Sequence, residues 1–148
     1  MIIITSEIAK KVIETVDAGL CSGLGKPIPG EMCVEAAVCY ALGFPHGDEP
    51  ICVSRALRML KMRLNDSCWS SNAARASGLR KLSILQLGSN GELDDIAFVQ
   101  RLVPLAAAYA ANATGAAAAN AANYAVAAIA RAVADTANYA ADYAADCC

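Results

Sequence analysis

The last third of the chain, from Leu105 to Cys148, is about half alanine, and this feature limits the possible folds more than any other. Its few polar residues recur every three or four positions, which places them on one face of an α-helix. They are Asn120, Asn123, Arg131, Asp135, Asn138, Asp142 and Asp146, whereas Val126, Ile129 and Val133 fall on the other side. Alanine favours the helix but offers little apolar surface to bury. We therefore expect a helix over about 116–146 that needs a closely packed partner, such as a second copy of the chain.

Helical spacing of apolar residues also runs through the first hundred residues, and no segment shows the sustained alternation of a strand. Capping residues, glycines and prolines set the expected helix ends. The predicted helices begin after Thr5 or Ser6, span about Glu31–Leu42, Pro50–Leu64 (with Asp48 as N-cap) and Asn72–Leu87, and begin again between Glu92 and Asp95, with a kink or restart at Pro104. We predict an all-α protein with a compact helical bundle at residues 1–103 and an alanine-rich helical extension at 104–148.

Charge is distributed unevenly along the chain, although the formal net charge is only −2. Between Pro50 and Lys81 there are seven basic residues and one acid. On the helix predicted from Pro50, the spacing places Arg55, Arg58, Lys61 and Asn65 on one outward stripe. Several arginines on one face can bind phosphate oxygens in bidentate fashion, and Trp69 could stack on a base. The candidate ligand-binding residues are Arg55, Arg58, Arg63, Trp69, Arg75, Arg80 and Lys81.

The same basic block has a purely structural interpretation, in which its side chains pair with acids of the first or fifth helix or of a neighbouring subunit. Glu31 and Glu35 are the only charges on an otherwise apolar helix, and an ion pair with the basic helix is their simplest account. If a ligand binds, a small nucleotide or an acidic protein partner suits the chain better than nucleic acid, because the chain as a whole is acidic.

Cys33 and His46 suggest a third interpretation, a cysteine hydrolase, because a thiol near a helix N-terminus can have a lowered pKa. Such enzymes take their histidine from a later β-rich half, which this pattern lacks. We expect His46 instead to be a loop residue that bonds Asp48. The cysteines lack the paired spacing of a zinc site, so no metal and no cofactor is expected.

Seven cysteines without a secretion signal favour free thiols in a reducing, cytoplasmic setting, and the redox state of Cys147 and Cys148 stays open. No stretch has the length and bulk of a membrane span, so no membrane contact is expected.

The block from Gly30 to Gly88, which begins GEMCVEAAVCYALGFPHGDEP, resembles small hypothetical proteins of tailed bacteriophages and some bacteria. Those proteins also carry alanine-rich tails punctuated by tyrosine. The resemblance implies a phage product acting in the host bacterial cytoplasm and assigns no activity. Together these observations predict a non-enzymatic helical homo-oligomer whose basic face holds an anionic ligand. A structural or assembly protein without a small ligand is the first alternative, and a cysteine hydrolase is the second.

Overall fold

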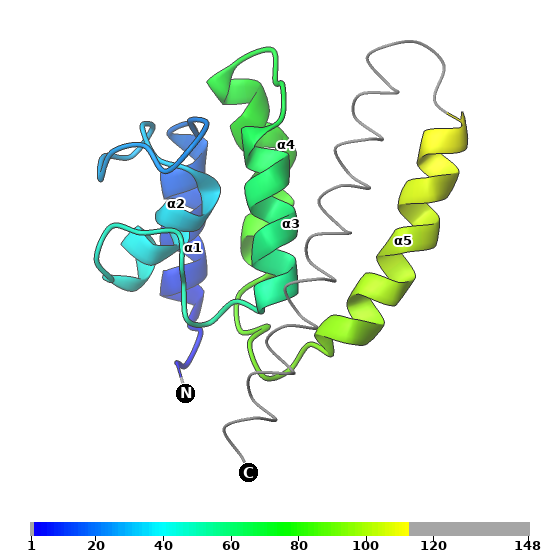
Figure 1. Ribbon diagram of the computed structural model, residues 1–148. Coiled ribbons are helices and arrows are strands. Elements are labelled where there is room, and N and C mark those ends of the chain that lie inside the picture. Colours follow the sequence, from blue (N-terminus) through cyan, green and yellow to red (C-terminus); the bar gives the residue numbers. More distant parts are fainter. Residues whose placement is uncertain (1, 113–148) are drawn as a thin grey trace.

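The computed structural model describes residues 2–112, which form five α-helices (Figure 1). The helices are α1 (Ser6–Asp17), α2 (Val34–Leu42), α3 (Arg55–Asp66), α4 (Asn72–Leu85) and α5 (Asp95–Asn112). Within these residues the only β-type pairing is a single bridge between Gly25 and Met32. The all-α prediction is therefore confirmed for the described part of the chain. The predicted alanine-rich helix lies outside it.

Side-chain caps start all five helices near the positions where the sequence suggests polar caps or helix starts, and at α5 Asp94 Oδ1 accepts a hydrogen bond from Ala97 N. Thr5 Oγ1 accepts a hydrogen bond from Ile8 N at the start of α1, and Ser71 Oγ accepts one from Ala74 N at the start of α4. Ser54 does the same for α3, accepting from Leu57 N. At α2 the cap is the Cys33 thiol, whose sulfur lies 3.3 Å from Ala36 N. These contacts satisfy backbone N–H groups that a helix leaves without internal partners.

Two predicted helix starts are wrong, because the chain forms a β-bridge before α2 and a turn before α3. The second helix begins at Val34 and not at Glu31, since Met32 pairs with Gly25 and its carbonyl accepts from Cys21 N at 3.0 Å. The third helix begins at Arg55 and not at Pro50. Its N-cap is Ser54, whereas Asp48 contacts Arg58.

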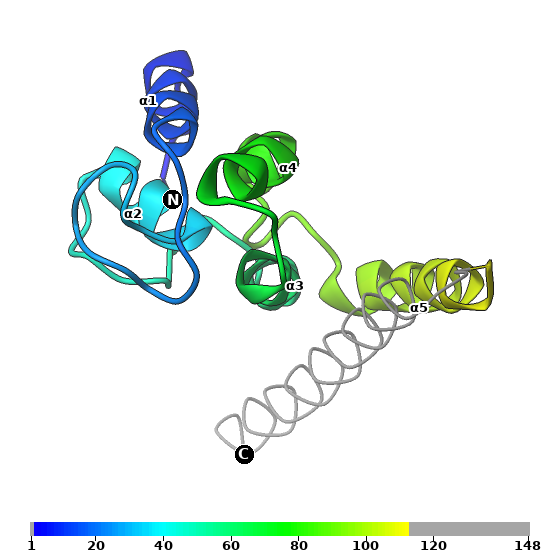
Figure 2. The same cartoon turned by 90° about the horizontal axis from the view of Figure 1, so that it is seen from above.

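The main core lies among α1, α2 and α4, with α3 packed against α2 and α4 (Figure 2). α2 is buried almost all round, as its apolar sequence predicts: seven of its residues are buried. Glu35 is one of the seven, and it is fully buried. The centre of this core therefore contains a carboxyl group.

Helix α5 lies at the edge of the molecule and, among the described residues, packs against α3 and no other helix (Figure 2). A small apolar cluster of Ala56, Val99 and Ala106 forms this contact, with Met59, Phe98 and Leu102 at its margin. α5 continues through Pro104 without a break. The boundary expected between residues 103 and 104 thus falls inside one helix.

Candidate functional site

The most unusual group in the interior is an ion pair between α2 and α3. Lys61 Nζ lies 3.3 Å from Glu35 Oε1, and both side chains are 0% exposed. Neither group makes a hydrogen bond in the described structure, and the same holds for both polar side-chain atoms of buried Gln86 just after α4. The expectation that Glu35 pairs with the basic helix is confirmed. Glu31 instead bonds Lys26 at 2.8 Å, in the loop before α2.

Burial shifts the pKa of both partners of this pair toward their neutral forms. Loss of solvation lowers the pKa of Lys61 to about 8, against the attraction of Glu35. Loss of solvation likewise raises the pKa of the Glu35 carboxyl, although Lys61 opposes this. A low-dielectric interior penalises each charge separately, and the pair only partly compensates. Glu35 and Lys61 can share or exchange a proton. Because both side chains are fully buried, neither group can contact a substrate.

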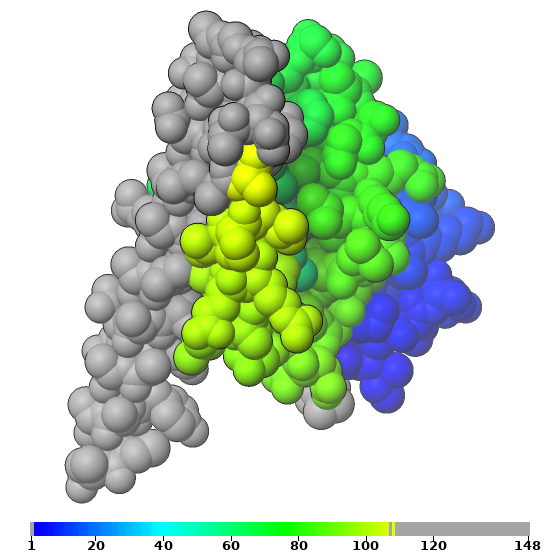
Figure 3. Space-filling view, turned by 90° about the vertical axis from the view of Figure 1, so that its right-hand side faces the viewer, coloured from blue at the N-terminus to red at the C-terminus, as the bar shows by residue number. Residues whose placement is uncertain are grey.

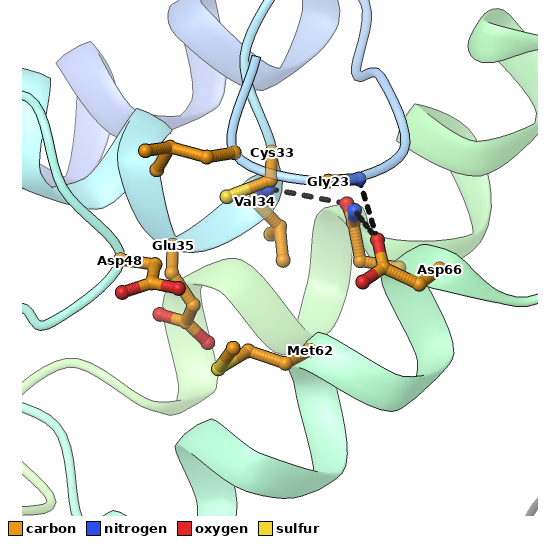
Figure 4. Close-up of a pocket in the computed structure, with 9 residues that line it drawn as sticks. Gly23, Cys33, Val34, Glu35, Asp48, Met62 and Asp66 are labelled. Carbon is orange, nitrogen blue, oxygen red and sulfur yellow. Dashed lines mark hydrogen bonds between the residues drawn. The ribbon is translucent and has the colours of Figure 1, made fainter.

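A small cavity of about 30 Å³ lies beside Glu35, between the loop before α2 and the end of α3 (Figure 4). This volume accommodates a water molecule but no larger ligand. Glu35 and Met62 point toward each other across it, with Asp48 and Asp66 at opposite ends (Figure 4). Its lining residues are Gly23, Leu24, Cys33, Val34, Glu35, Asp48, Met62, Asn65 and Asp66.

The loop over this cavity is fixed by polar residues at the end of α3. Asn65 accepts from Val34 N at 3.2 Å and donates to Cys21 O at 2.9 Å. Asp66 accepts from Gly23 N at 2.7 Å. These bonds hold the N-terminus of α2 against α3 and thereby set the position of Glu35.

The predicted outward stripe on α3 is wrong for two of its members, because Lys61 is 0% and Asn65 1% exposed. Arg55 is exposed, and Arg58 is half-buried. Both charged groups of the loop before α3 contact Arg58: Asp48 Oδ1 at 3.2 Å and Glu49 Oε1 at 3.0 Å.

The other candidate ligand-binding residues are scattered over the molecule. Arg75 is buried and donates to Asn65 O and Leu20 O. Arg80 forms a two-bond pair with Asp17 of α1, at 2.6 and 3.0 Å, which agrees with pairing to acids of the first helix. Arg63 and Lys81 are exposed on different helices.

Trp69 is turned inward and packs on α4. Its indole Nε1 donates to Leu64 O at 2.8 Å. A methyl group built at Gly78 would lie 2.3 Å from the ring, so the missing side chain of Gly78 makes room for it. The packing of Trp69 against α4 therefore requires glycine at position 78.

The candidate hydrolase residues Cys33 and His46 do not form a nucleophile–base pair in the described structure. Cys33 is 5% exposed, and burial raises the pKa of its thiol to about 11. His46 Nε2 contacts Gly25 O at 3.1 Å, in place of the expected bond to Asp48. A protonated thiol is a poor nucleophile at neutral pH.

The exposed apolar surface of α5 is the second candidate site, and neither charge nor motif analysis of the sequence singled it out. Ile96, Val103 and Leu105 are 57%, 44% and 67% exposed. Figure 3 shows α5, in yellow-green, at the surface of the molecule beside the green helices. Large exposed apolar side chains that gather on one element mark interaction sites.

Residues 2–112 contain neither a metal-binding cluster nor a membrane-spanning helix. No group of three or more His, Cys, Asp or Glu side chains is placed to hold a metal ion. No described helix has the length and apolar character needed to cross a membrane.

No protein-family model matches the chain, and no curated protein or solved structure matches it either. Its function therefore has to follow from the geometry of its own residues.

Proposed function

We propose that this protein is a non-enzymatic assembly protein that forms a helical homo-oligomer through α5. The observation that carries the proposal is that α5 packs against α3 alone while exposing Ile96, Val103 and Leu105. A helix that is apolar on several sides buries those sides in the assembled protein. The other four helices form the body of the protein, and α5 packs on this body through α3.

The occupant that we assign to this surface is a second copy of the chain. Closed homo-oligomers are the commonest assemblies of soluble proteins, and their interfaces are self-complementary. The alanine-rich segment that follows α5 supports the assignment, because small side chains let helix backbones approach closely. Resemblance to phage proteins supports the further proposal that assembly occurs in an infected bacterial cytoplasm.

The pairing of the basic residues favours an assembly protein over an anion-binding one. Arg58, Arg75 and Arg80 each contact acids or carbonyl groups of their own chain. An anion would have to displace those partners. Charged groups already paired in this way contribute to the fold and not to a free binding surface.

A hollow on the surface of α4 supports anion binding as a second candidate function. Ser77, Arg80 and Lys81 line a shallow hollow on α4 together with Ile84 and Leu85. A nucleotide phosphate held there would raise the melting temperature of the protein, and Lys81→Glu would remove that increase. Lys10→Glu, the same charge reversal at an exposed residue of α1 outside the hollow, is the matched control.

Sedimentation velocity of the full chain over a wide concentration series tests the assembly proposal. We expect a discrete oligomer whose population grows with concentration. A monomer at every concentration would contradict the proposal.

A further inference from the structure

Helix α5 carries apolar side chains on both sides of the stripe that it buries against α3. Val99 and Ala106 form the centre of that stripe, at 5% and 9% exposure. At 100° per residue, Ile96 and Val103 fall on one side of it and Leu105 on the other. Ile96 and Val103 are seven residues apart, so they lie almost in line along the helix. This line of two residues is called the Ile96 flank below.

The sequence continues directly from the end of α5 at Asn112 into the alanine-rich segment, which lies outside the described residues. Thr114 and Gly115 follow almost at once, and glycine interrupts helices and supports tight turns. Two helices joined by a turn of a few residues form an antiparallel αα-hairpin. The place where α5 ends therefore puts the next segment within reach of its flanks.

The apolar residues of that segment match the Ile96 flank in register. In an antiparallel hairpin centred between Thr114 and Gly115, residues at equal distances from the turn lie opposite one another. Val126 is then opposite Val103, and Val133 is opposite Ile96. Ile129 falls between the two pairs, and alanines fill the positions around them.

We propose that the segment from Ala116 to Val133 folds back along α5 and covers the Ile96 flank of its own chain. Val126, Ile129 and Val133 supply the apolar contact, and the alanines allow close approach of the two helices. This inference rests on the proposed function, because it assigns one flank of α5 to the chain's own segment and leaves the Leu105 side for the second copy.

Disulfide trapping in the full chain tests the fold-back. The background replaces Cys68, Cys147 and Cys148 by serine, because Cys68 is exposed and the other two are terminal. Val103→Cys with Val126→Cys places two thiols in register, and Ile96→Cys with Val133→Cys gives an independent pair. The control joins Val103→Cys to Ala122→Cys, one helical turn out of register, since a disulfide forms only when the two Cα atoms lie within about 7 Å.

Mild oxidation should produce an intrachain disulfide in both in-register pairs, with a yield several-fold above that of the control. Equal yields, or none in either pair, would overturn the inference. A disulfide between two chains would also overturn it, because a second copy would then occupy the Ile96 flank. Sedimentation of the reduced samples measures self-association separately, so a failed fold-back and a failed assembly proposal give different results.

Discussion

Lys61 Nζ lies 3.3 Å from Glu35 Oε1 in the centre of the protein, where neither side chain reaches solvent. Removing two charges from water costs several kcal/mol per ion, and mutual attraction offsets this only when the geometry is good. Here neither partner has a further hydrogen bond among the described residues. The pair therefore fixes how α2 meets α3 without adding much net stability.

Substitution of one partner should be far more harmful than substitution of both. Lys61→Met leaves the Glu35 carboxylate buried without a counter-charge, and we expect a loss of about 3–5 kcal/mol in the free energy of unfolding. Lys61→Met combined with Glu35→Gln should recover most of that loss. Denaturant titration followed by circular dichroism measures all three proteins.

An exposed ion pair on α1 supplies the control for the Lys61 substitutions. Lys10 and Glu14 lie 3.8 Å apart on α1 and are 77% and 64% exposed. Lys10→Met should change the free energy of unfolding by less than about 1 kcal/mol. If Lys61→Met behaves like Lys10→Met, the interior pair does not exist as described.

The buried lysine should also give stability a characteristic pH dependence. Burial lowers the pKa of Lys61 to about 8, whereas an unfolded chain keeps the ordinary value near 10.5. Between those two values the unfolded chain binds the proton that the folded protein has released, so the contribution of Lys61 to the free energy of unfolding rises with pH.

The measurement is the difference in the free energy of unfolding between the unsubstituted protein and the Glu35→Gln/Lys61→Met variant across pH 8 to 10.5. Cys33 and Cys39 act in the opposite direction, because burial raises the pKa of each thiol to about 11. Both proteins contain these cysteines, so the part of their contribution that burial causes, which is the largest part, cancels in the difference. A difference that falls over this range would contradict the assignment.

Thiol labelling should distinguish the interior cysteines from the exposed one. Cys33 and Cys39 are 5% and 2% exposed, whereas Cys68 is exposed. Under native conditions iodoacetamide should modify Cys68 well before either of the other two, as measured by peptide mass spectrometry. In denaturant the three rates should converge. Fastest labelling at Cys33 would instead support the cysteine hydrolase.

A methyl group at Gly78 should disturb the packing of Trp69. The Gly78→Ala substitution gains up to about 1 kcal/mol of helix propensity. The added methyl group would meet the indole ring at 2.3 Å, and overpacking of this kind costs about 1–3 kcal/mol. We expect net destabilisation and a red-shifted tryptophan emission, which reports this site alone because the chain has one tryptophan. Ser77→Ala, on the exposed neighbour, should neither destabilise the protein nor shift the emission.

Local sequence signals predicted the helices well where caps and apolar spacing act within one segment. Thr5 and the serines before Asn72 are such signals, and α1 and α4 begin where these residues indicate. The starts of α2 and α3 depend also on contacts with residues outside the helix. Met32 is held by Gly25, and Ala56 N donates to Asp95 across 39 residues of sequence. Helical periodicity contains no information about such contacts.

The inner position of Lys61 shows why charge alone did not identify the site. On α3 it follows Arg58 at helical spacing, and both were assigned to one outward stripe. The useful signal lay on the other helix: Glu35 is an acid within an apolar segment that the pattern placed in the core. A buried acid requires a partner, and a long lysine side chain from α3 can reach it. The uncovered flanks of α5 could not be predicted, because they depend on which helices pack around α5.

The central claim is that the Leu105 side of α5 forms the contact between copies of the chain, and one substitution tests it most directly. Leu105 is 67% exposed, so Leu105→Lys leaves the fold of a single chain intact. Ala73→Lys adds the same charge to an exposed position of α4, a helix that does not pack against α5, and is the matched control. Light scattering coupled to size-exclusion chromatography should show a monomer for Leu105→Lys and the parental oligomer for Ala73→Lys. An oligomer of unchanged mass in the Leu105→Lys protein would contradict the claim.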